Sequence, residues 1–198
     1  TGGNEVDTVT MAYIYKAGEL VELTINPTLT FVCNAVGSGQ DVQPNKDTGG
    51  VQTTVASTAS GIDHDNNVTA AANGISAHDL EVNTNASGGY DVFIRHTQQL
   101  TNANSDTIAN HTGTNAAPTT FPGAGNEAWG YTTDDADLAQ FGAAEYAGFT
   151  TSNEQVLTNS GATGTAETTR VGHQVGVANT TPAGTYLTTI VYTIVATY

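Results

Sequence analysis

The C-terminal stretch 167–198 constrains the fold more than any other part of this chain. It holds two runs in which apolar and polar side chains alternate, with the breakers 179–184 between them. A repeat of two residues is typical of β-strands, so the stretch predicts a terminal hairpin. The second run is apolar on both faces, with Tyr186, Ile190, Tyr192 and Ile194 on one and Leu187, Val191 and Val195 on the other. Because a hairpin alone cannot cover both faces, the stretch also predicts two packed sheets.

Similar alternation recurs along the chain. It marks strands over 6–15 and 20–33, and a second hairpin formed by 75–83 and 90–96 around the turn residues 85–89. No long helical repeat is present, and only 134–141 has the pattern of one short helical turn. The predicted fold class is therefore all-β: a single β-sandwich, jelly-roll or Ig-like, mostly antiparallel and with long polar loops.

The domain organisation follows from the same patterns. A chain of 198 residues is long enough for one sizeable core, and no linker divides it. We expect residues 1–15 to form an N-terminal strand and residues 16–198 to form the β-sandwich domain. The segment 100–125 is polar apart from Ile108 and Phe121, which predicts a long surface excursion held by these two side chains.

Acidic residues dominate the charge of the chain. Lys and Arg together number 4 and Asp and Glu together number 19, so the net charge is −15. A surface this negative repels phosphate groups, which argues against nucleic acid and anionic membranes as partners. No run approaches the ~20 apolar residues of a membrane span, so no membrane insertion is expected in the mature form.

The composition also bears on location. The sequence begins at Thr1 without an initiator Met, is poor in lysine and is rich in Thr, Asn and Gly. These features are typical of an exported chain whose leader has been removed, so we expect a secreted, extracellular or cell-surface protein. The only cysteine, Cys33, lies in an apolar alternating run and is expected to be a small buried hydrophobe.

Three segments carry a resemblance to known proteins. They are LTINPTLTF (23–31), LEVNTNASGGYDVFI (80–94) and TPAGTYLTTIVYTIVATY (181–198). In this order they resemble exported bacterial β-sandwich surface proteins with a C-terminal PAGTY…VYT strand. The chain is more distantly similar to camelysin-type and bundling-pilin fibre subunits, which are jelly rolls assembled by donation of an N-terminal strand. The resemblance implies a fold and a location, and it carries no catalytic residue across.

The N-terminal strand is the segment whose pattern most favours a function. A strand near a chain end can leave its own subunit and add to the sheet of a neighbour, where its backbone supplies the hydrogen bonds. Side chains on one face would then fill the neighbour's groove, and these are Val9, Met11, Tyr13 and Tyr15. The apolar face of the last strand is the expected acceptor groove, formed by Tyr186, Ile190, Tyr192 and Ile194. The alternative is an ordinary first strand paired within its own sheet.

Metal and glycan sites are weaker hypotheses. Oxygen-bearing side chains at Asp63, Asp65 and Asn67 alternate as in the opening of a calcium loop, but the Gly and Glu of an EF-hand are missing. A second acidic cluster lies at 134–137. For each of the two clusters, the alternative to a calcium site is a solvated turn. No cofactor other than calcium is indicated. Four acceptor sequons predict glycosylation sites at Asn67, Asn85, Asn110 and Asn179.

No catalytic spacing can be defended, so we expect no enzyme. The primary hypothesis is a structural subunit of an extracellular filament, pilus-like or a matrix fibre, or of a surface coat. Copies of the chain would be its partners, joined into a homopolymer by inter-subunit β-strand addition. The alternative is a monomeric secreted adhesion or carbohydrate-binding β-sandwich, calcium-dependent or not, with a surface formed by Trp129, Tyr131, Tyr146 and the segment 97–125.

Overall fold

The computed structural model describes residues 22–64 and 68–198, and within them the fold is all-β, as predicted. The strands are β1 (Leu29–Ala35), β2 (Ser57–Thr58), β3 (Gly61–Ile62), β4 (Gly74–Thr84), β5 (Tyr90–His96), β6 (Thr119–Thr120), β7 (Ala128–Thr133), β8 (Glu145–Gly148), β9 (Glu154–Asn159), β10 (Glu167–Gly176) and β11 (Ile190–Ala196). No helix of these residues is long and apolar enough to cross a bilayer. The predicted N-terminal strand over 1–15 lies outside the described residues.

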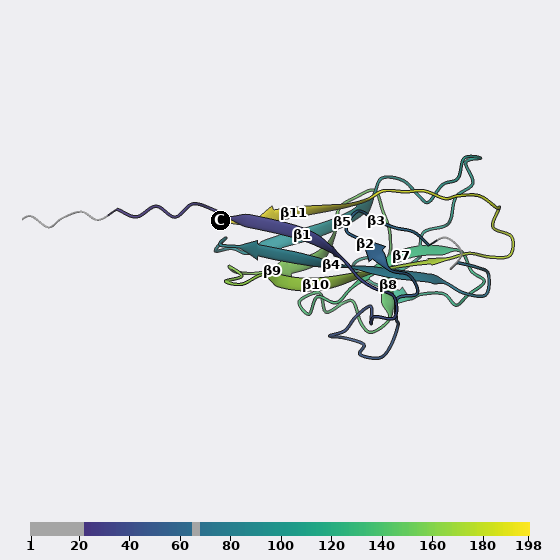
Figure 1. Ribbon diagram of the computed structural model, residues 1–198, viewed down its shortest axis with the longest axis horizontal. Helices are drawn as coiled ribbons and strands as arrows, with labels where there is room; N and C mark the ends of the chain where they lie inside the picture. The colour runs from purple at the N-terminus through teal and green to yellow at the C-terminus, as the bar shows by residue number, and fades with distance from the viewer. Residues whose placement is uncertain (1–21, 65–67) are drawn as a thin grey trace, which may run out of the picture.

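The strands form two main antiparallel sheets (Figure 1). One has six strands in the order β1-β4-β10-β7-β8-β6, and the other has three in the order β11-β5-β9. The strands β2 and β3 pair as a separate ribbon. Both main sheets contribute to one buried cluster, in which Leu80 and Val82 of β4 join Val92 and Ile94 of β5, each 0% exposed. The inward faces of these strands were therefore predicted correctly.

The two predicted hairpins are wrong, although their strands exist. β4 pairs with β1 and β10, whereas β5 pairs with β11 and β9, so the turn 85–89 crosses from one sheet to the other. Likewise β10 lies in the six-stranded sheet and β11 in the three-stranded sheet. An alternating strand buries its apolar face equally well beside its neighbour or across the core from it, so periodicity alone does not separate the two arrangements.

Burial on both faces belongs to β10 and not to the last strand. Residues 171–176 are all buried, whereas Val195 of β11 is 50% exposed and Leu187 is 66% exposed. The segment 36–56 covers the outer face of β10, where a Cβ added at Gly172 would collide with the Val42 side chain. β10 is central in its sheet, which is why it needs a cover on each side.

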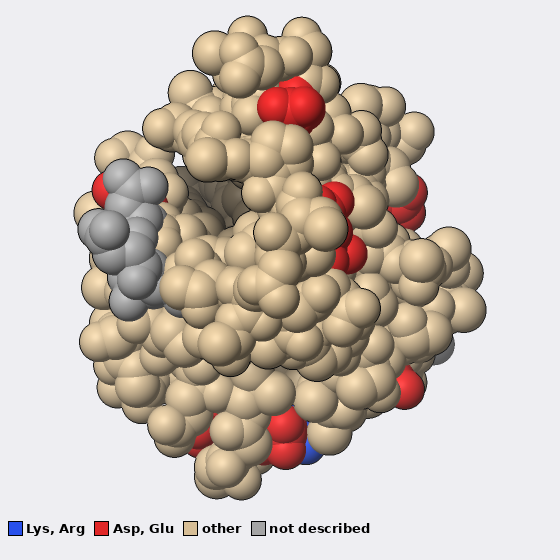
Figure 2. Space-filling view, turned by 90° about the vertical axis from the view of Figure 1, so that its right-hand side faces the viewer, with Lys and Arg blue, Asp and Glu red and all other residues tan. Residues whose placement is uncertain are grey.

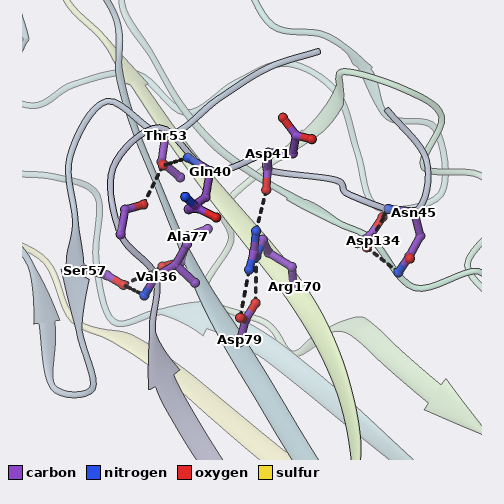
Figure 3. A network of polar contacts seen from close by, with 11 residues as sticks. Val36, Gln40, Asp41, Asn45, Thr53, Ser57, Ala77, Asp79, Asp134 and Arg170 are labelled. Carbon is purple, nitrogen blue, oxygen red and sulfur yellow. Dashed lines mark hydrogen bonds and ion pairs between the residues drawn. The ribbon is translucent and has the colours of Figure 1, made fainter. Parts of the chain in front are cut away.

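A polar network fastens the segment 36–56 to the sheet (Figure 3). Arg170 donates from Nε and Nη2 to the two carboxylate oxygens of Asp79, at 2.7 and 2.9 Å, and from Nη1 to the Asp41 carbonyl at 2.7 Å. The Ser57 hydroxyl donates to the Ala77 carbonyl at 2.6 Å and accepts from the Val36 N–H at 2.9 Å. These bonds satisfy backbone groups of a long segment that contains no main-sheet strand.

Two further expectations are corrected, and a third is confirmed. The strand expected over 20–33 begins only at Leu29 in the described chain, and Leu23 and Ile25, which lie before it, are 82% and 74% exposed. The segment 134–141 forms two successive turns instead of a helical turn, closed by the bonds from the Leu138 N–H to the Asp135 carbonyl and from the Phe141 N–H to the Leu138 carbonyl. The excursion 100–125 is held by buried Ile108 and Phe121, as predicted.

Candidate functional site: a seam and a cavity between the sheets

The edge strands of the two main sheets meet along one side of the molecule. β1 ends the six-stranded sheet and β11 ends the three-stranded sheet, and the two strands lie next to each other in Figure 1. The ring centroids of Phe31 and Tyr192 are 6.4 Å apart in an edge-to-face arrangement. Within 22–64 and 68–198, neither strand has a ladder partner on its outer edge. We call this line of contact between β1 and β11 the seam.

The core is least covered along the seam. The apolar side chains that touch the core cluster but stay partly exposed come largely from these two strands: Phe31, Cys33, Ile190, Tyr192, Ile194 and Ala196. Side chains of the other strands in that cluster are almost wholly buried. Two open strand edges with a half-covered apolar face between them are the features that a strand-addition site requires.

The predicted acceptor residues lie here. Ile190, Tyr192 and Ile194 face the core from β11, and Tyr186 precedes that strand. The predicted donor residues Val9, Met11, Tyr13 and Tyr15 lie outside the described residues. The structure therefore brings the acceptor set together, while the donor role stays a prediction.

The described chain begins as an extended segment that leaves the body at one end (Figure 1). The segment 22–28 forms no strand, and its exit is fixed at Thr28, whose carbonyl accepts from the hydroxyls of Thr84 at 2.8 Å and Tyr198 at 3.0 Å. The Asn85 amide accepts from the Thr28 N–H and donates to the Asn26 carbonyl, both at 2.8 Å. Beyond this anchor, the exposed Leu23 and Ile25 lack any apolar cover from the described chain.

A cavity of about 940 Å³ continues from the seam. Cys33, Ile190 and Tyr192 belong to both, and the cavity is also lined by His78, Trp129 and Tyr186. Figure 2 shows a hollow in the end of the molecule opposite the exit of residues 22–28. No Lys or Arg of the described chain lines the cavity. Its size falls in the range of cavities that hold ligands.

Three residues that line the cavity each hold a buried ring nitrogen without a hydrogen-bond partner within the described chain. These nitrogens are Nδ1 of His64, Nδ1 of His78, a residue 5% exposed, and Nε1 of Trp129, a residue 3% exposed. His78 Nε2 lies 2.9 Å from the Thr58 carbonyl oxygen, so this nitrogen carries the proton and Nδ1 of the neutral ring is an acceptor. Buried polar groups are nearly always paired, so these three nitrogens are exceptions within the fold.

The ring of a fully buried histidine, His173, contacts the rings of both His78 and Trp129. The ring of His173 is 5.4 Å from that of His78 and 6.4 Å from that of Trp129, and its Nε2 is 2.9 Å from the Tyr192 hydroxyl. Burial lowers the pKa of His173 well below its usual value, and the nearby His78 and His64 lower it further. Burial likewise lowers the pKa of His78, and that of His64 to about 4. All three rings are therefore neutral at neutral pH.

This histidine group was missed because its members have no ligand spacing in the sequence. The pairing of β4 with β10 brings them together, since His78 stands opposite Val171 and Ser76 opposite His173. The sequence did contain one signal for His78. In the alternating pattern of β4, Ser76 and His78 fall on the same face as Leu80 and Val82, which indicates that His78 points inward. Among residues 22–64 and 68–198, no group of three or more His, Cys, Asp or Glu is arranged to hold a metal ion.

The predicted calcium residues are only partly described. Asp63 is exposed and lines the cavity, whereas Asp65 and Asn67 lie outside the described residues. In the second acidic cluster, Asp134 accepts from the N–H groups of Asn45 and Lys46, and Asp135 accepts from that of Thr158. These two carboxylates fasten loops to the sheet. Burial raises the pKa of both.

The predicted glycosylation residues differ in accessibility. Asn179 is exposed, Asn110 is partly buried and Asn67 lies outside the described residues. Asn85 is exposed, but its amide atoms are engaged with the segment 26–28, so a glycan there would break both hydrogen bonds.

The three aromatic side chains proposed for the carbohydrate-binding alternative are buried in the fold. Trp129, Tyr131 and Tyr146 are 3%, 0% and 1% exposed. The Trp129 ring stacks on Phe149 at 4.6 Å, so this face is not open to a sugar.

Comparison of the chain with protein-family models, with curated proteins and with solved structures finds no significant match.

Proposed function

We propose that this chain is a structural subunit that forms homopolymers by β-strand addition, as a building block of an extracellular filament or surface coat. The observation that carries the proposal is the seam: two edge strands from different sheets lie side by side with half-covered apolar side chains between them. An added strand would pair with open backbone groups and cover Phe31, Tyr192 and Ile194.

The exit of the N-terminal segment supports the same function. The segment 22–28 is anchored at Thr28 and leaves the body with two exposed apolar side chains. The preceding residues carry the alternating pattern of a donor strand. The exit of residues 22–28 and the hollow lie at opposite ends of the molecule (Figures 1 and 2). Each copy would therefore donate its N-terminal segment at one end and bind the N-terminal segment of another copy from the other end. Such a contact does not close on itself, and repetition gives a filament.

Electron microscopy of the full-length chain tests the proposal with a matched pair of variants. Met11→Lys places a charge on the face expected to enter the seam, whereas Thr10→Lys places the same charge on the opposite face. Filaments from the wild type and from Thr10→Lys, and their loss in Met11→Lys, are the expected result.

A chain lacking residues 1–15, with its fold checked by circular dichroism, is expected to remain monomeric and to add to the ends of wild-type filaments. Filaments from the truncated chain, or equal assembly of the two lysine variants, would overturn strand addition. Monodisperse wild-type particles at high concentration would overturn the filament itself.

A further inference from the structure

We propose that the cavity is a docking site for a second copy of the chain, and that the side chains which enter it are Leu23 and Ile25 of that copy. The proposal rests on the proposed function, because it names a surface at which one copy binds the next. It adds a contact made by the exit segment, separate from the expected donor strand over 1–15.

The exit segment carries the two most exposed large apolar side chains of the described chain, Leu23 and Ile25. They are two residues apart in an extended segment, so they project from the same side of it, with Thr24 on the opposite side. Apolar side chains of this size are stabilised when they leave water, and a pair of them on one side of a segment is typical of a contact surface.

The exit segment is held away from its own copy. The Asn85 amide accepts from the Thr28 N–H and donates to the Asn26 carbonyl, which fixes the direction of the exit. Pro27 between them has a restricted φ, and the residue before a proline is restricted to extended conformations. Ile25 lies three residues before Thr28, at most about 10 Å along the chain. The segment leaves the body at the end opposite the hollow, so another molecule must cover it (Figures 1 and 2).

The cavity has the lining that two aliphatic side chains require. Its walls include aliphatic side chains from both main sheets and from the loops beside them: Leu100, Ile108, Val175, Val177 and Ile190. No Lys or Arg of the described chain lines it, so a carboxylate or phosphate would enter without a counter-charge. Leucine and isoleucine need no counter-charge, and their burial there removes apolar surface of both copies from water.

The positions of the two surfaces allow the contact to repeat. Because the exit and the hollow lie at opposite ends of the molecule, a copy that docks its exit segment keeps its own cavity free for the next copy. The cavity also shares Cys33, Ile190 and Tyr192 with the seam. Docking of Leu23 and Ile25 and the proposed strand addition therefore use one continuous surface.

Disulfide trapping between two full-length chains tests the contact directly. One chain carries Ile25→Cys and the other Leu187→Cys, at an exposed residue of the cavity lining, and both carry Cys33→Ala so that each has one thiol. Val195→Cys replaces Leu187→Cys in the control, because Val195 is also exposed but does not line the cavity. A disulfide requires Cα atoms within about 7 Å, so we expect the cavity pair to form the mixed disulfide at least about tenfold faster than the control pair.

A second position on the lining keeps this test decisive. Ala183 is exposed and lines the cavity, so Ala183→Cys is paired with Ile25→Cys in the same way. Rates no faster than that of the Val195→Cys control at both Leu187→Cys and Ala183→Cys would overturn the proposal.

A matched pair of charge variants tests the effect on assembly. Ile25→Asp places a carboxylate on the side expected to enter the cavity, whereas Thr24→Asp places the same charge on the opposite side of the segment. We expect Ile25→Asp to raise the critical concentration for filaments about tenfold or more, because the cavity offers its carboxylate no counter-charge, and Thr24→Asp to change it little. Equal critical concentrations for the two variants would overturn the docking.

Strand addition and cavity docking fail in different ways. If Met11→Lys abolishes filaments but Ile25→Asp assembles as Thr24→Asp does, strand addition stands and the docking falls. If Met11→Lys assembles like the wild type while the mixed disulfide forms at the cavity, the docking stands and strand addition falls. Where the wild type forms no filaments, the mixed disulfide still decides whether the cavity binds the exit segment.

Discussion

His173 of β10 and Tyr192 of β11 join the two main sheets through one polar contact, in which Nε2 of the ring and the hydroxyl oxygen are 2.9 Å apart. His173 is 0% exposed, so Tyr192 is the partner that keeps one of its nitrogens satisfied. The same Tyr192 lines both the seam and the cavity. The contact therefore couples the stability of the core to the proposed binding surface.

Tyr192→Phe is expected to lower the free energy of unfolding by about 1–3 kcal/mol, because it leaves a buried nitrogen of His173 without a partner. Urea unfolding followed by circular dichroism measures the change. Tyr198→Phe removes a hydroxyl that donates to the Thr28 carbonyl at the surface. This variant is expected to lower the free energy of unfolding by much less than Tyr192→Phe. Equal losses in the two variants would contradict this account.

Stability is expected to fall as the pH falls from about 7 to about 5. Burial lowers the pKa of His64, His78 and His173 in the folded chain, that of His64 to about 4. In the unfolded chain these rings take up protons near their usual pKa of about 6.5, so acidification favours unfolding. The stability they contribute is thus complete above about pH 6.5 and is lost below it.

Urea midpoints across this range test the pH prediction, and His64→Gln is expected to reduce the slope. Asp134 and Asp135 act in the opposite direction nearer pH 4, because burial raises their pKa. A midpoint that stays constant or rises as the pH falls from about 7 to about 5 would refute the prediction.

Arg170→Lys is expected to lower the free energy of unfolding by about 1–3 kcal/mol, because an ammonium cannot hold both carboxylate oxygens of Asp79 and the Asp41 carbonyl. Arg95→Lys is the matched control, since Arg95 forms no ion pair with any residue of the described ranges. Thermal unfolding of both variants measures the difference. A loss for Arg95→Lys as large as that for Arg170→Lys would show that the network is not the cause.

Gly172→Ala is expected to destabilise the chain by about 1–3 kcal/mol and to loosen the segment 36–56, because its Cβ would overlap the Val42 side chain. Limited proteolysis should then cut within 36–56 sooner than in the wild type. Gly37→Ala adds the same atom where nothing lies within 4 Å, so its digestion pattern should be unchanged.

Filament formation is expected to require salt. With a net charge of −15, copies repel one another as they approach. Raising the ionic strength from about 0.01 M to about 0.15 M shortens the screening length from about 30 Å to about 8 Å and should lower the critical concentration. Light scattering across a NaCl series measures it, and a critical concentration that rises with salt would argue against contact between like-charged copies.

The sequence predicted the inward faces of the strands far better than their partners. Leu80, Val82, Val92 and Ile94 are core residues because alternation fixes which side chains point inward. The same alternation is compatible with β4 and β5 as neighbours or as opposite layers, and only the long-range register decides. The predicted acceptor residues lie together for the same reason, since Ile190, Tyr192 and Ile194 follow one strand.

The cavity could not be predicted in this way. Its lining combines residues from segments far apart in the sequence, among them His78, Trp129 and Tyr186. These residues come together only through the packing of the two sheets and their loops, which alternation does not predict. The exposure of Leu23 and Ile25 could not be predicted either. An apolar alternating run predicts a strand, but it does not show whether the same chain contains a sheet with which that strand pairs.

The crossing between β4 and β5 has a consequence for the order in which the chain folds. β4 does not pair with β5, the next strand along the chain; it pairs with β1 and β10. The β10 pairing places Val82 opposite Glu167, so it can form only after β10 has been synthesised. β5 likewise pairs with β11, so this pairing can form only after the last strand of the chain has been synthesised. Pairings that close loops this long carry a large entropic barrier, and proteins dominated by them fold in milliseconds to seconds instead of microseconds. A nascent chain therefore cannot complete either main sheet early, and its core closes only when the final residues arrive.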